Sequence, residues 1–122
     1  MADIRKGVRH LFIVSQRMAG IDDIKSAKAG TLKLIDIRKK PDEQQIPGSL
    51  RYDGEALERS EQLPFAKDER VIVYCGSGNS SSRVAQTLRN RGYNADALTG
   101  GYTAWLDAGL PLEPIAELRD LK

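Results

Sequence analysis

Short β-branched runs alternate along the chain with longer amphipathic stretches. Three of the runs predict β-strands: Leu32–Ile37, Val71–Tyr74 and the weaker Ala95–Leu98. The run Val71–Tyr74 has four consecutive strand-forming residues and no polar break, which is typical of a strand that is covered on both faces. Alternating strands and helices of this kind predict an α/β domain built around a parallel sheet.

The stretches between the strands have the apolar spacing of helices. This spacing predicts helices over Ile21–Ala29, Gly54–Gln62, Ser81–Arg91 and Tyr102–Ala108. A glycine comes directly after three of these stretches and a proline follows the fourth, as expected where helices end.

The two ends of the chain have a less regular pattern. We expect residues 1–20 to be an N-terminal extension that is partly disordered or forms an edge strand at Leu11–Val14. Residues 21–114 then make up the domain. Residues 115–122 are expected to be a C-terminal tail or a short covering helix, because two of their apolar residues have a helical spacing.

Length and composition fit a single globular domain. The chain has 122 residues, of which 40% are hydrophobic and 30% charged, and this is enough to bury a core without crosslinks. The formal net charge of +2 is too small to favour nucleic acid or an anionic membrane as a partner. No stretch approaches the ~20 apolar residues of a membrane span, and the N-terminus does not resemble a secretory signal, so we expect a cytoplasmic protein.

Metal-binding residues are scarce in the sequence. The chain contains one cysteine, Cys75, and one histidine, His10. An internal disulfide and a cysteine-rich zinc site are therefore excluded, and a metal site made by the protein alone would have to use carboxylates. We expect no metal and no other cofactor.

The candidate chemistry lies at the end of the strand Val71–Tyr74. Cys75 follows this strand directly, the small residues Gly76–Ser80 come next, and the predicted helix begins after them. Ligands of open α/β sheets bind beyond the carboxyl ends of the strands, which is where this thiol lies. The two glycines of the loop allow successive backbone N–H groups to turn inward and form a nest for an anion.

The helix that follows the loop favours ionisation of the thiol. A helix N-terminus offers unpaired N–H groups and the positive end of the helix dipole. Thiols in such positions have pKa values of about 3.5–7.5, against ~8.5 for a free cysteine. We therefore predict that Cys75 is substantially ionised at neutral pH and nucleophilic. The alternative is an inert, core-filling cysteine, for which a glycine-rich turn is a poor setting.

Three ordered motifs resemble the rhodanese-like sulfurtransferase family. The sequence Tyr-Cys-Gly-Ser-Gly-Asn-Ser at 74–80 is similar to the family's active-site strand and loop. Asp-Ile-Arg at 36–38 and Ile-Pro-Gly-Ser at 46–49 are similar to its Asp-Val-Arg strand and Ile-Pro-Gly-Ala turn. Gly-Gly-Tyr-Thr-Ala-Trp at 100–105 resembles its Gly-Gly-x-x-x-Trp ending, and the likeness extends over roughly residues 21–114.

The resemblance implies both a fold and an activity. The fold is a five-stranded, mostly parallel sheet flanked by helices on both faces. The activity is that of a rhodanese-type sulfurtransferase, thiosulfate:cyanide or related, in which Cys75 takes sulfur from a donor such as thiosulfate or mercaptopyruvate and becomes a persulfide. Because the chain has no second thiol, the acceptor is expected to come from outside, as a small thiol, cyanide or a partner protein.

The remaining candidate residues surround Cys75. We expect the substrate to be bound by the loop residues Gly76, Ser77, Gly78, Asn79 and Ser80. Asp36 and Arg38 are interpreted as a structural ion pair or a brace for the loop. Arg83, one helical turn beyond the loop, either meets an anionic donor or is an ordinary exposed arginine.

Two segments depart from the family pattern. Residues 38–46 lack the usual aromatic and Gly-His pair and look roughly two residues short, so we expect a tighter loop and a wider mouth beside the site. Lys39 and Lys40 in this segment form a solvated turn that could meet an acidic partner. Residues 76–80 carry no charge, whereas family members that favour thiosulfate often have a cation there, and the Cys-Gly-Ser-Gly opening is closer to the mercaptopyruvate type.

Two other functions remain as alternatives. A cysteine phosphatase or arsenate reductase of related fold needs an arginine six positions after the cysteine to hold the oxyanion, and Ser81 stands at that position. A non-catalytic rhodanese-like module for protein interaction or regulation would most simply have lost the cysteine, which is present here with an intact loop.

Overall fold

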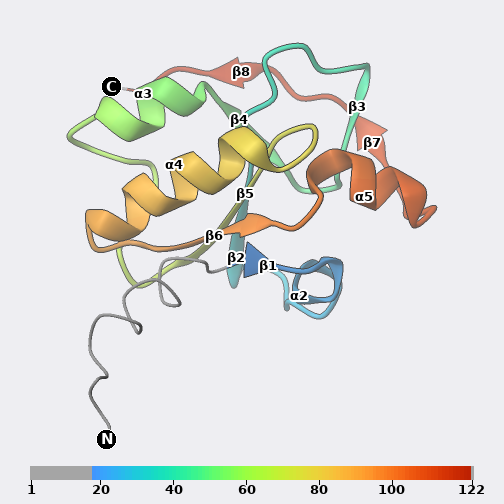
Figure 1. Cartoon of the computed structure of the whole chain (residues 1–122), viewed down its shortest axis with the longest axis horizontal. Coiled ribbons are helices and arrows are strands. Elements are labelled where there is room, and N and C mark those ends of the chain that lie inside the picture. The colour runs from blue at the N-terminus through green and yellow to red at the C-terminus, as the bar shows by residue number, and fades with distance from the viewer. Residues whose placement is uncertain (1–17, 122) are drawn as a thin grey trace, which may run out of the picture.

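The computed structural model describes residues 18–121, so the edge strand predicted at Leu11–Val14 lies outside the described residues. The elements in chain order are β1 Met18–Ala19, α2 Ile21–Lys25, β2 Leu32–Asp36, β3 Gln44–Gln45, β4 Leu50–Tyr52, α3 Gly54–Arg59, β5 Arg70–Tyr74, α4 Asn79–Asn90, β6 Asn94–Leu98, α5 Gly101–Asp107, β7 Glu113–Pro114 and β8 Leu118–Arg119. Figure 1 shows α3 and α4 side by side above the sheet, with α5 at one end of it.

The central sheet has six parallel strands in the order β1-β6-β5-β2-β4-β8. The two central strands, β2 and β5, pair along their whole length, from Leu32 opposite Arg70 to Asp36 opposite Tyr74. The predicted α/β class with a mostly parallel sheet is therefore confirmed. The sheet has six strands rather than the five that the resemblance implied, and its two edge strands, β1 and β8, have two residues each.

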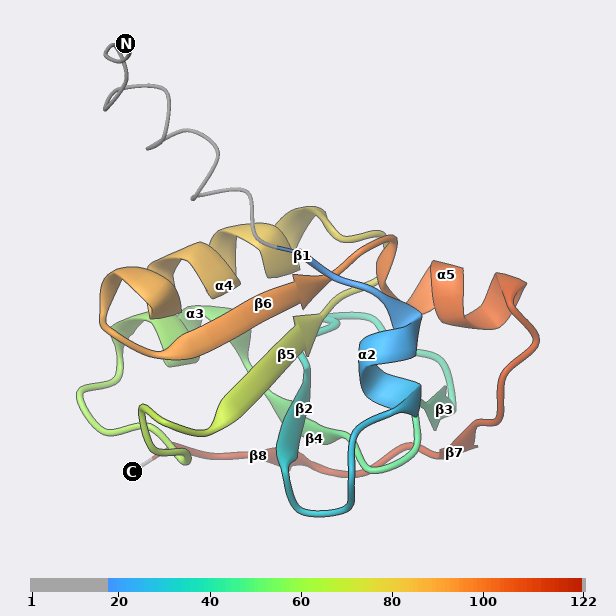
Figure 2. The same cartoon turned by 90° about the horizontal axis from the view of Figure 1, so that it is seen from below.

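Helices cover both faces of this sheet, and each face has its own apolar core (Figures 1 and 2). Successive residues of a strand point to opposite faces, so β5 sends Val71 and Val73 to one core and Ile72 and Tyr74 to the other. The first core contains residues of α3 and α4: Leu57, Val84, Ala85 and Leu88. The second contains residues of α2 and α5: Ile21, Ile24, Tyr102 and Trp105.

The predicted helices are all present, with shifted ends. The stretch Ile21–Ala29 is helical only to Lys25, and α3 ends at Arg59. The helix after Cys75 begins at Asn79 rather than Ser81, which brings its N-terminus closer to the thiol. Within the part of the chain that the structure describes, no helix has the length and apolar character of a membrane span.

The C-terminal tail forms a strand, not the short helix that was one of its two predicted forms. Its backbone is bound by side chains from distant parts of the chain: Ala116 N–H donates to Gln45 Oε1 at 2.9 Å, and Arg51 donates to the Ala116 carbonyl at 3.3 Å. These groups are therefore not free for helical hydrogen bonds. The chain then continues into β8, which pairs with β4.

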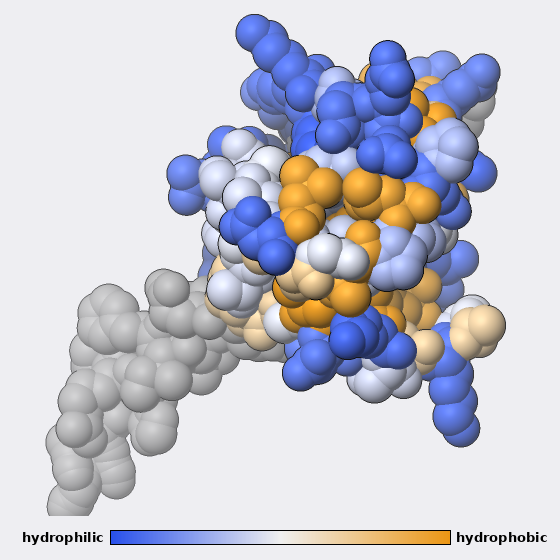
Figure 3. Space-filling view, turned by 90° about the vertical axis from the view of Figure 1, so that its right-hand side faces the viewer, coloured by the Kyte–Doolittle hydropathy of each residue, from blue (hydrophilic) through white to orange (hydrophobic). Residues whose placement is uncertain are grey.

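Apolar side chains reach the surface on the side of the molecule that carries α5. A groove of about 380 Å³ lies between α2 and the segment after α5, lined by Ile24, Lys25, Pro47, Trp105, Leu110 and Pro111. Figure 3 shows apolar side chains gathered in the middle of this side, with hydrophilic ones around them.

Candidate active site

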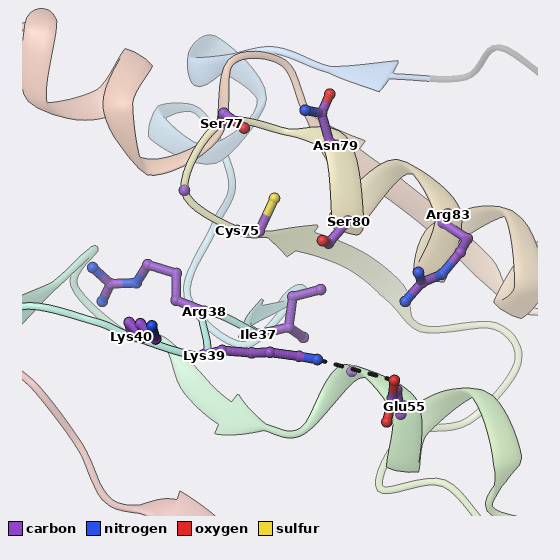
Figure 4. Close-up of a pocket in the computed structure, with 12 residues that line it drawn as sticks. Ile37, Arg38, Lys39, Lys40, Glu55, Cys75, Ser77, Asn79, Ser80 and Arg83 are labelled. Carbon is purple, nitrogen blue, oxygen red and sulfur yellow. Dashed lines mark ion pairs between the residues drawn. The ribbon is translucent and has the colours of Figure 1, made fainter.

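Cys75 lies at the carboxyl edge of the sheet, directly after β5 and beside the end of β2. The residue is only 7% exposed. A pocket of about 440 Å³ opens beside it, lined by Ile37, Arg38, Lys39, Lys40, Gly54, Glu55, Cys75, Gly76, Ser77, Asn79, Ser80 and Arg83. Figure 4 shows the sulfur enclosed by the loop that joins β5 to α4. Among residues 18–121, no cluster of histidine, cysteine or carboxylate side chains is arranged to hold a metal ion.

The loop after Cys75 directs hydrogen-bond donors at the sulfur. The backbone N–H groups of Gly78 and Ser81 lie 3.1 and 3.4 Å from Sγ, and the Ser81 hydroxyl donates to Sγ at 3.4 Å. Gly78 has a φ of 109°, a left-handed conformation that is open to glycine and strained for other residues. This turn brings the first residues of α4 around the thiol, as the predicted nest requires.

The start of α5 holds the same loop from outside. The N–H groups of Tyr102 and Thr103 donate to the carbonyls of Cys75 and Gly76 at 2.8 and 3.0 Å. Gly101 makes this approach possible, because a Cβ at that position would lie 2.5 Å from the Cys75 carbonyl oxygen. The glycine pair of the third motif therefore lets one helix begin against the back of the thiol loop.

These donors change the acidity of Cys75. Burial raises the pKa of the thiol, but hydrogen bonds from the Ser81 hydroxyl and from the backbone N–H groups of Ser81, Gly78 and Ser80 outweigh it. The pKa of Cys75 therefore lies below its ordinary value, in the predicted direction. A thiolate held in this way is a nucleophile that needs no neighbouring base.

Ser81 was not among the predicted site residues. The sequence singled it out only because a phosphatase would have an arginine there, yet its side chain is fully buried against Sγ and also donates to the Gly78 carbonyl at 3.3 Å. The predicted loop residues Ser77, Asn79 and Ser80 line the pocket. Figure 4 shows the Ser80 hydroxyl pointing into the pocket and the Asn79 side chain pointing away from the sulfur.

Asp36 and Arg38 form a buried ion pair at the neighbouring strand end. Arg38 donates to both Asp36 carboxylate oxygens, with Nη2 2.8 Å from Oδ2. Burial lowers the pKa of Arg38, but its hydrogen bonds and charge attraction to Asp36 hold that pKa above its ordinary value. The guanidinium also stacks over the Tyr102 ring at 3.8 Å, and in Figure 4 it points away from Cys75. The contacts are those of a structural pair.

The segment after Arg38 is held close to the body of the protein. Asp42 accepts hydrogen bonds from the Gln44 N–H at 2.9 Å and from the Tyr102 hydroxyl at 3.1 Å, and Arg38 donates to it at 3.4 Å. The hydrogen bond from the Gln44 N–H contributes most to lowering the pKa of Asp42. Asp42 therefore closes this turn, and Lys39 and Lys40 line the pocket.

Arg83 reaches the same pocket from α4. Its Nε lies 3.3 Å from Glu58 Oε2, and its side chain is 58% exposed. On the opposite side of the mouth, Lys39 lies 4.0 Å from Glu55 (Figure 4). The structure thus brings Cys75, its loop and Arg83 together, and adds two lysines that the motifs did not assign to the site.

Comparisons with known proteins agree with the three motifs. Residues 21–108 match the family described as Rhodanese-like domain. A protein named Sulfurtransferase from Allochromatium vinosum is 33% identical over 103 residues, covering 81% of this chain and 87% of that protein. A solved structure from Rhodopseudomonas palustris, described as a possible tyrosine phosphatase, is 26% identical with a TM-score of 0.66 and covers 93% of this chain and 98% of its own.

One relative matches over a shorter stretch. The mitochondrial protein High Arsenic Content 1 of Arabidopsis thaliana is 50% identical over 44 residues, which are 35% of this chain. The matched stretch spans only 26% of that protein's length.

Proposed function

The chain belongs to the rhodanese-like domain family, and from this premise we propose that it is a sulfurtransferase that carries a sulfane sulfur on Cys75. The observation that carries the proposal is the set of donors around the thiol. Sγ accepts from two backbone N–H groups and one hydroxyl, of Gly78 and Ser81. These donors favour a negative sulfur and leave its pocket side open for a reaction partner.

In the first step, the thiolate of Cys75 attacks the outer sulfur of the donor. With thiosulfate, the Sγ–S bond forms as the donor's S–S bond breaks, and the electron pair leaves with sulfite. The product is a persulfide anion on Cys75, so the total charge is unchanged. The N–H groups of Gly78 and Ser81 remain in place to stabilise the negative charge after transfer.

In the second step, a nucleophilic acceptor takes the outer sulfur of the persulfide. The new bond joins the acceptor to that sulfur, the Sγ–S bond breaks, and its electron pair returns to Sγ. The same donors that lower the pKa of Cys75 make Sγ a good leaving group. The same hydrogen-bond donors of Gly78 and Ser81 therefore support both half-reactions.

The cations at the pocket suit an anionic donor. Thiosulfate and mercaptopyruvate both carry negative charge beside the sulfur that is transferred. The loop itself supplies only neutral groups, and Arg83, Lys39 and Lys40 line the pocket around it. We propose donors of this type, with Arg83 as the candidate contact because it belongs to the helix that starts at the thiol.

A phosphatase activity is less well supported by the same geometry. A phosphate group needs a guanidinium that faces it across the loop. The position six residues after Cys75 holds Ser81, whose hydroxyl is directed at the sulfur. This contact favours sulfur transfer over oxyanion hydrolysis.

The test is to incubate the purified protein with thiosulfate or with mercaptopyruvate and to measure its intact mass. We expect a gain of one sulfur atom that maps to Cys75 and is removed by a thiol. Absence of any gain with both donors would contradict the proposal and favour a non-catalytic interaction module. Phosphatase assays on the same preparation, expected to be negative, would separate the remaining alternative.

A further inference from the structure

A cationic rim borders the mouth of the Cys75 pocket. We use this name for Lys39 and Lys40, which follow β2, and Arg83 of α4. Lys39 and Arg83 are 72% and 58% exposed, and Lys40 forms no ion pair with another described residue. Figure 4 shows these residues around the pocket, with the uncharged loop nearer to the sulfur.

The rim has more positive than negative charge. Glu55 is the one carboxylate among the pocket-lining residues that the structure describes, and it lies 4.0 Å from Lys39. Arg38 also lines the pocket, but its charge is balanced by the buried Asp36. Glu58, which does not line the pocket, lies 3.3 Å from Arg83, so two rim cations have carboxylate partners and Lys40 has none among the described residues.

The position of the rim suits a large partner better than a small one. A small anionic donor at Sγ engages one cation of the rim, Arg83 in the function proposed above, and leaves Lys39 and Lys40 at the mouth without a role. A polypeptide that brings a thiol to Sγ places its neighbouring side chains at the mouth, where carboxylates meet several cations at once. Such charge complementarity steers association and selects among partners.

We propose that the sulfur acceptor is a cysteine thiol on a polypeptide with carboxylates beside that cysteine, and that the cationic rim selects it. This inference rests on the proposed sulfur transfer and names the acceptor class for that reaction. The acceptor must come from outside because Cys75 is the only cysteine of the chain.

The transfer step balances without any further reactant. The acceptor thiolate attacks the outer sulfur of the Cys75 persulfide, a new S–S bond forms on the acceptor, and the Sγ–S bond breaks. Its electron pair returns to Sγ as a thiolate, and the transferred sulfur keeps the negative charge that it carried in the Cys75 persulfide anion. One thiolate and one persulfide are consumed and one of each is formed, so there is no net oxidation.

Removing the charge of Glu55 should change the preference for an acidic acceptor in the direction opposite to reversing the charge of the lysines. Glu55 lies beside Lys39 at the mouth and competes with the carboxylates of the acceptor for that cation. Glu55→Gln is therefore expected to increase the preference for an acidic acceptor, whereas reversing the charge of the lysines decreases it.

The experiment uses protein that has already been loaded with sulfur on Cys75, so that only the acceptor step is measured. Three synthetic peptides of equal length are compared, each with a central cysteine flanked by glutamates, glutamines or lysines. The rate of persulfide appearance on each peptide is followed by mass spectrometry. At low salt we expect the acidic peptide to react at least about tenfold faster than the neutral one, with the basic peptide slowest. At 1 M salt, where the Debye length is about 3 Å, the rates should converge.

The variants are compared by the ratio of acidic to neutral peptide rates, which cancels any general loss of activity and any difference in peptide thiol acidity. Lys39→Glu with Lys40→Glu is expected to remove the acidic preference. The control is Lys28→Glu with Lys67→Glu, which makes the same change in net charge just before β2 and β5, at the opposite edge of the sheet. That control should keep most of the preference.

The outcomes distinguish this inference from the function on which it rests. Equal rates for the three peptides at low salt would overturn the inference, and so would a preference that the Lys39/Lys40 variant keeps. Failure of Cys75 to load sulfur from any donor would instead overturn the proposed function. Fast transfer to cyanide combined with slow transfer to every peptide would show a small-molecule acceptor and contradict the inference.

Discussion

Two buried ionisable groups lie at neighbouring strand ends, and the protein stabilises them in different ways. Asp36 ends β2 and lies against two guanidinium groups, with Arg38 Nη2 at 2.8 Å and Arg51 Nε at 3.6 Å. Cys75 follows β5 and is bound by uncharged donors, two N–H groups and a hydroxyl. The first group has an opposite charge as its partner, and the second has only dipoles.

This difference supports the structural role proposed for Asp36 and the chemical role proposed for Cys75. An oppositely charged partner fixes a carboxylate, because separating the pair would leave two unpaired charges in the interior. Neutral donors stabilise a negative sulfur without satisfying it fully, so it stays available to an incoming atom. The kind of partner, more than burial, therefore distinguishes the strand end that we propose to be reactive.

Removal of the Cys75 sulfur should have the largest effect of the substitutions at these two strand ends. We expect Cys75→Ser to reduce sulfur transfer to background, a loss on the order of 10⁴-fold or more, because a serine hydroxyl without a base is a weak nucleophile. The fold should remain, since the substitution is nearly isosteric. A thiosulfate–cyanide assay and a thermal melt check the two halves of this prediction, and retained turnover would show that Cys75 is not the carrier.

Asp36→Asn tests the contribution of the Asp36–Arg38 ion pair to stability. This change removes the buried carboxylate partner of Arg38, leaving only the more exposed Asp42, and is expected to cost about 3–5 kcal/mol of unfolding free energy, which is about 10²–10⁴-fold in the folded-to-unfolded ratio. Urea denaturation measures this loss.

The exposed Asp68 offers a matched control for that measurement. Asp68→Asn makes the same chemical change and should shift the unfolding free energy by no more than about 0.5 kcal/mol. If the two variants unfolded at the same urea concentration, the Asp36–Arg38 pair would contribute nothing to stability.

A change in the conformation of the loop after Cys75 should have the next largest effect, on the rate of persulfide formation. Gly78→Val places a β-branched residue at a φ of 109°, so relief of the strain would turn its N–H away from Sγ. We expect persulfide formation to slow by about 10–100-fold at neutral pH, as for the loss of one preorganised donor. Alkylation of Cys75 by iodoacetamide should slow with it.

Gly30→Val separates the effect of strain from the effect on the thiol. Gly30 has a similar φ of 83° and open space around it, but it lies before β2, at the opposite edge of the sheet. This variant is expected to lose stability without slowing persulfide formation. If both variants left the rate unchanged, the N–H group of Gly78 would not support the thiolate.

Much of the fold was predictable because its signals are local. The unbroken run at Val71–Tyr74 predicts a buried central strand, and the structure has it as β5. The strand β8 and the extended tail depend on bonds from Gln45 and Arg51, which are distant along the chain. No local pattern reports such long-range contacts, so the sequence favoured neither a strand nor this path.

In the site too, some features are set by adjacent residues and could be predicted, while others depend on residues far apart in the sequence. The position of Cys75 and the inward-facing N–H groups follow from the residues next to it. The support of its loop by Tyr102 and Thr103 comes from another motif and depends on how closely Gly101 lets the two segments approach. The role of Ser81 depends on which way one turn of α4 faces, and this orientation is set only when the helix packs.

Ser81→Ala is expected to have the smallest effect. It separates the contribution of the Ser81 hydroxyl to the pKa of Cys75 from that of the backbone N–H groups. Loss of the hydroxyl removes one donor from Sγ, which raises the pKa of Cys75 toward that of an ordinary thiol. The pH–rate curve for persulfide formation should therefore move to higher pH, with a roughly two- to tenfold loss on its acidic side and little loss on its plateau. Ser82→Ala is the matched control, because that hydroxyl donates to the Gly78 carbonyl at 2.7 Å and to Met18 Sδ at 3.7 Å, and not to Cys75 Sγ. Identical curves for both variants would mean that backbone N–H groups alone set the acidity of the thiol.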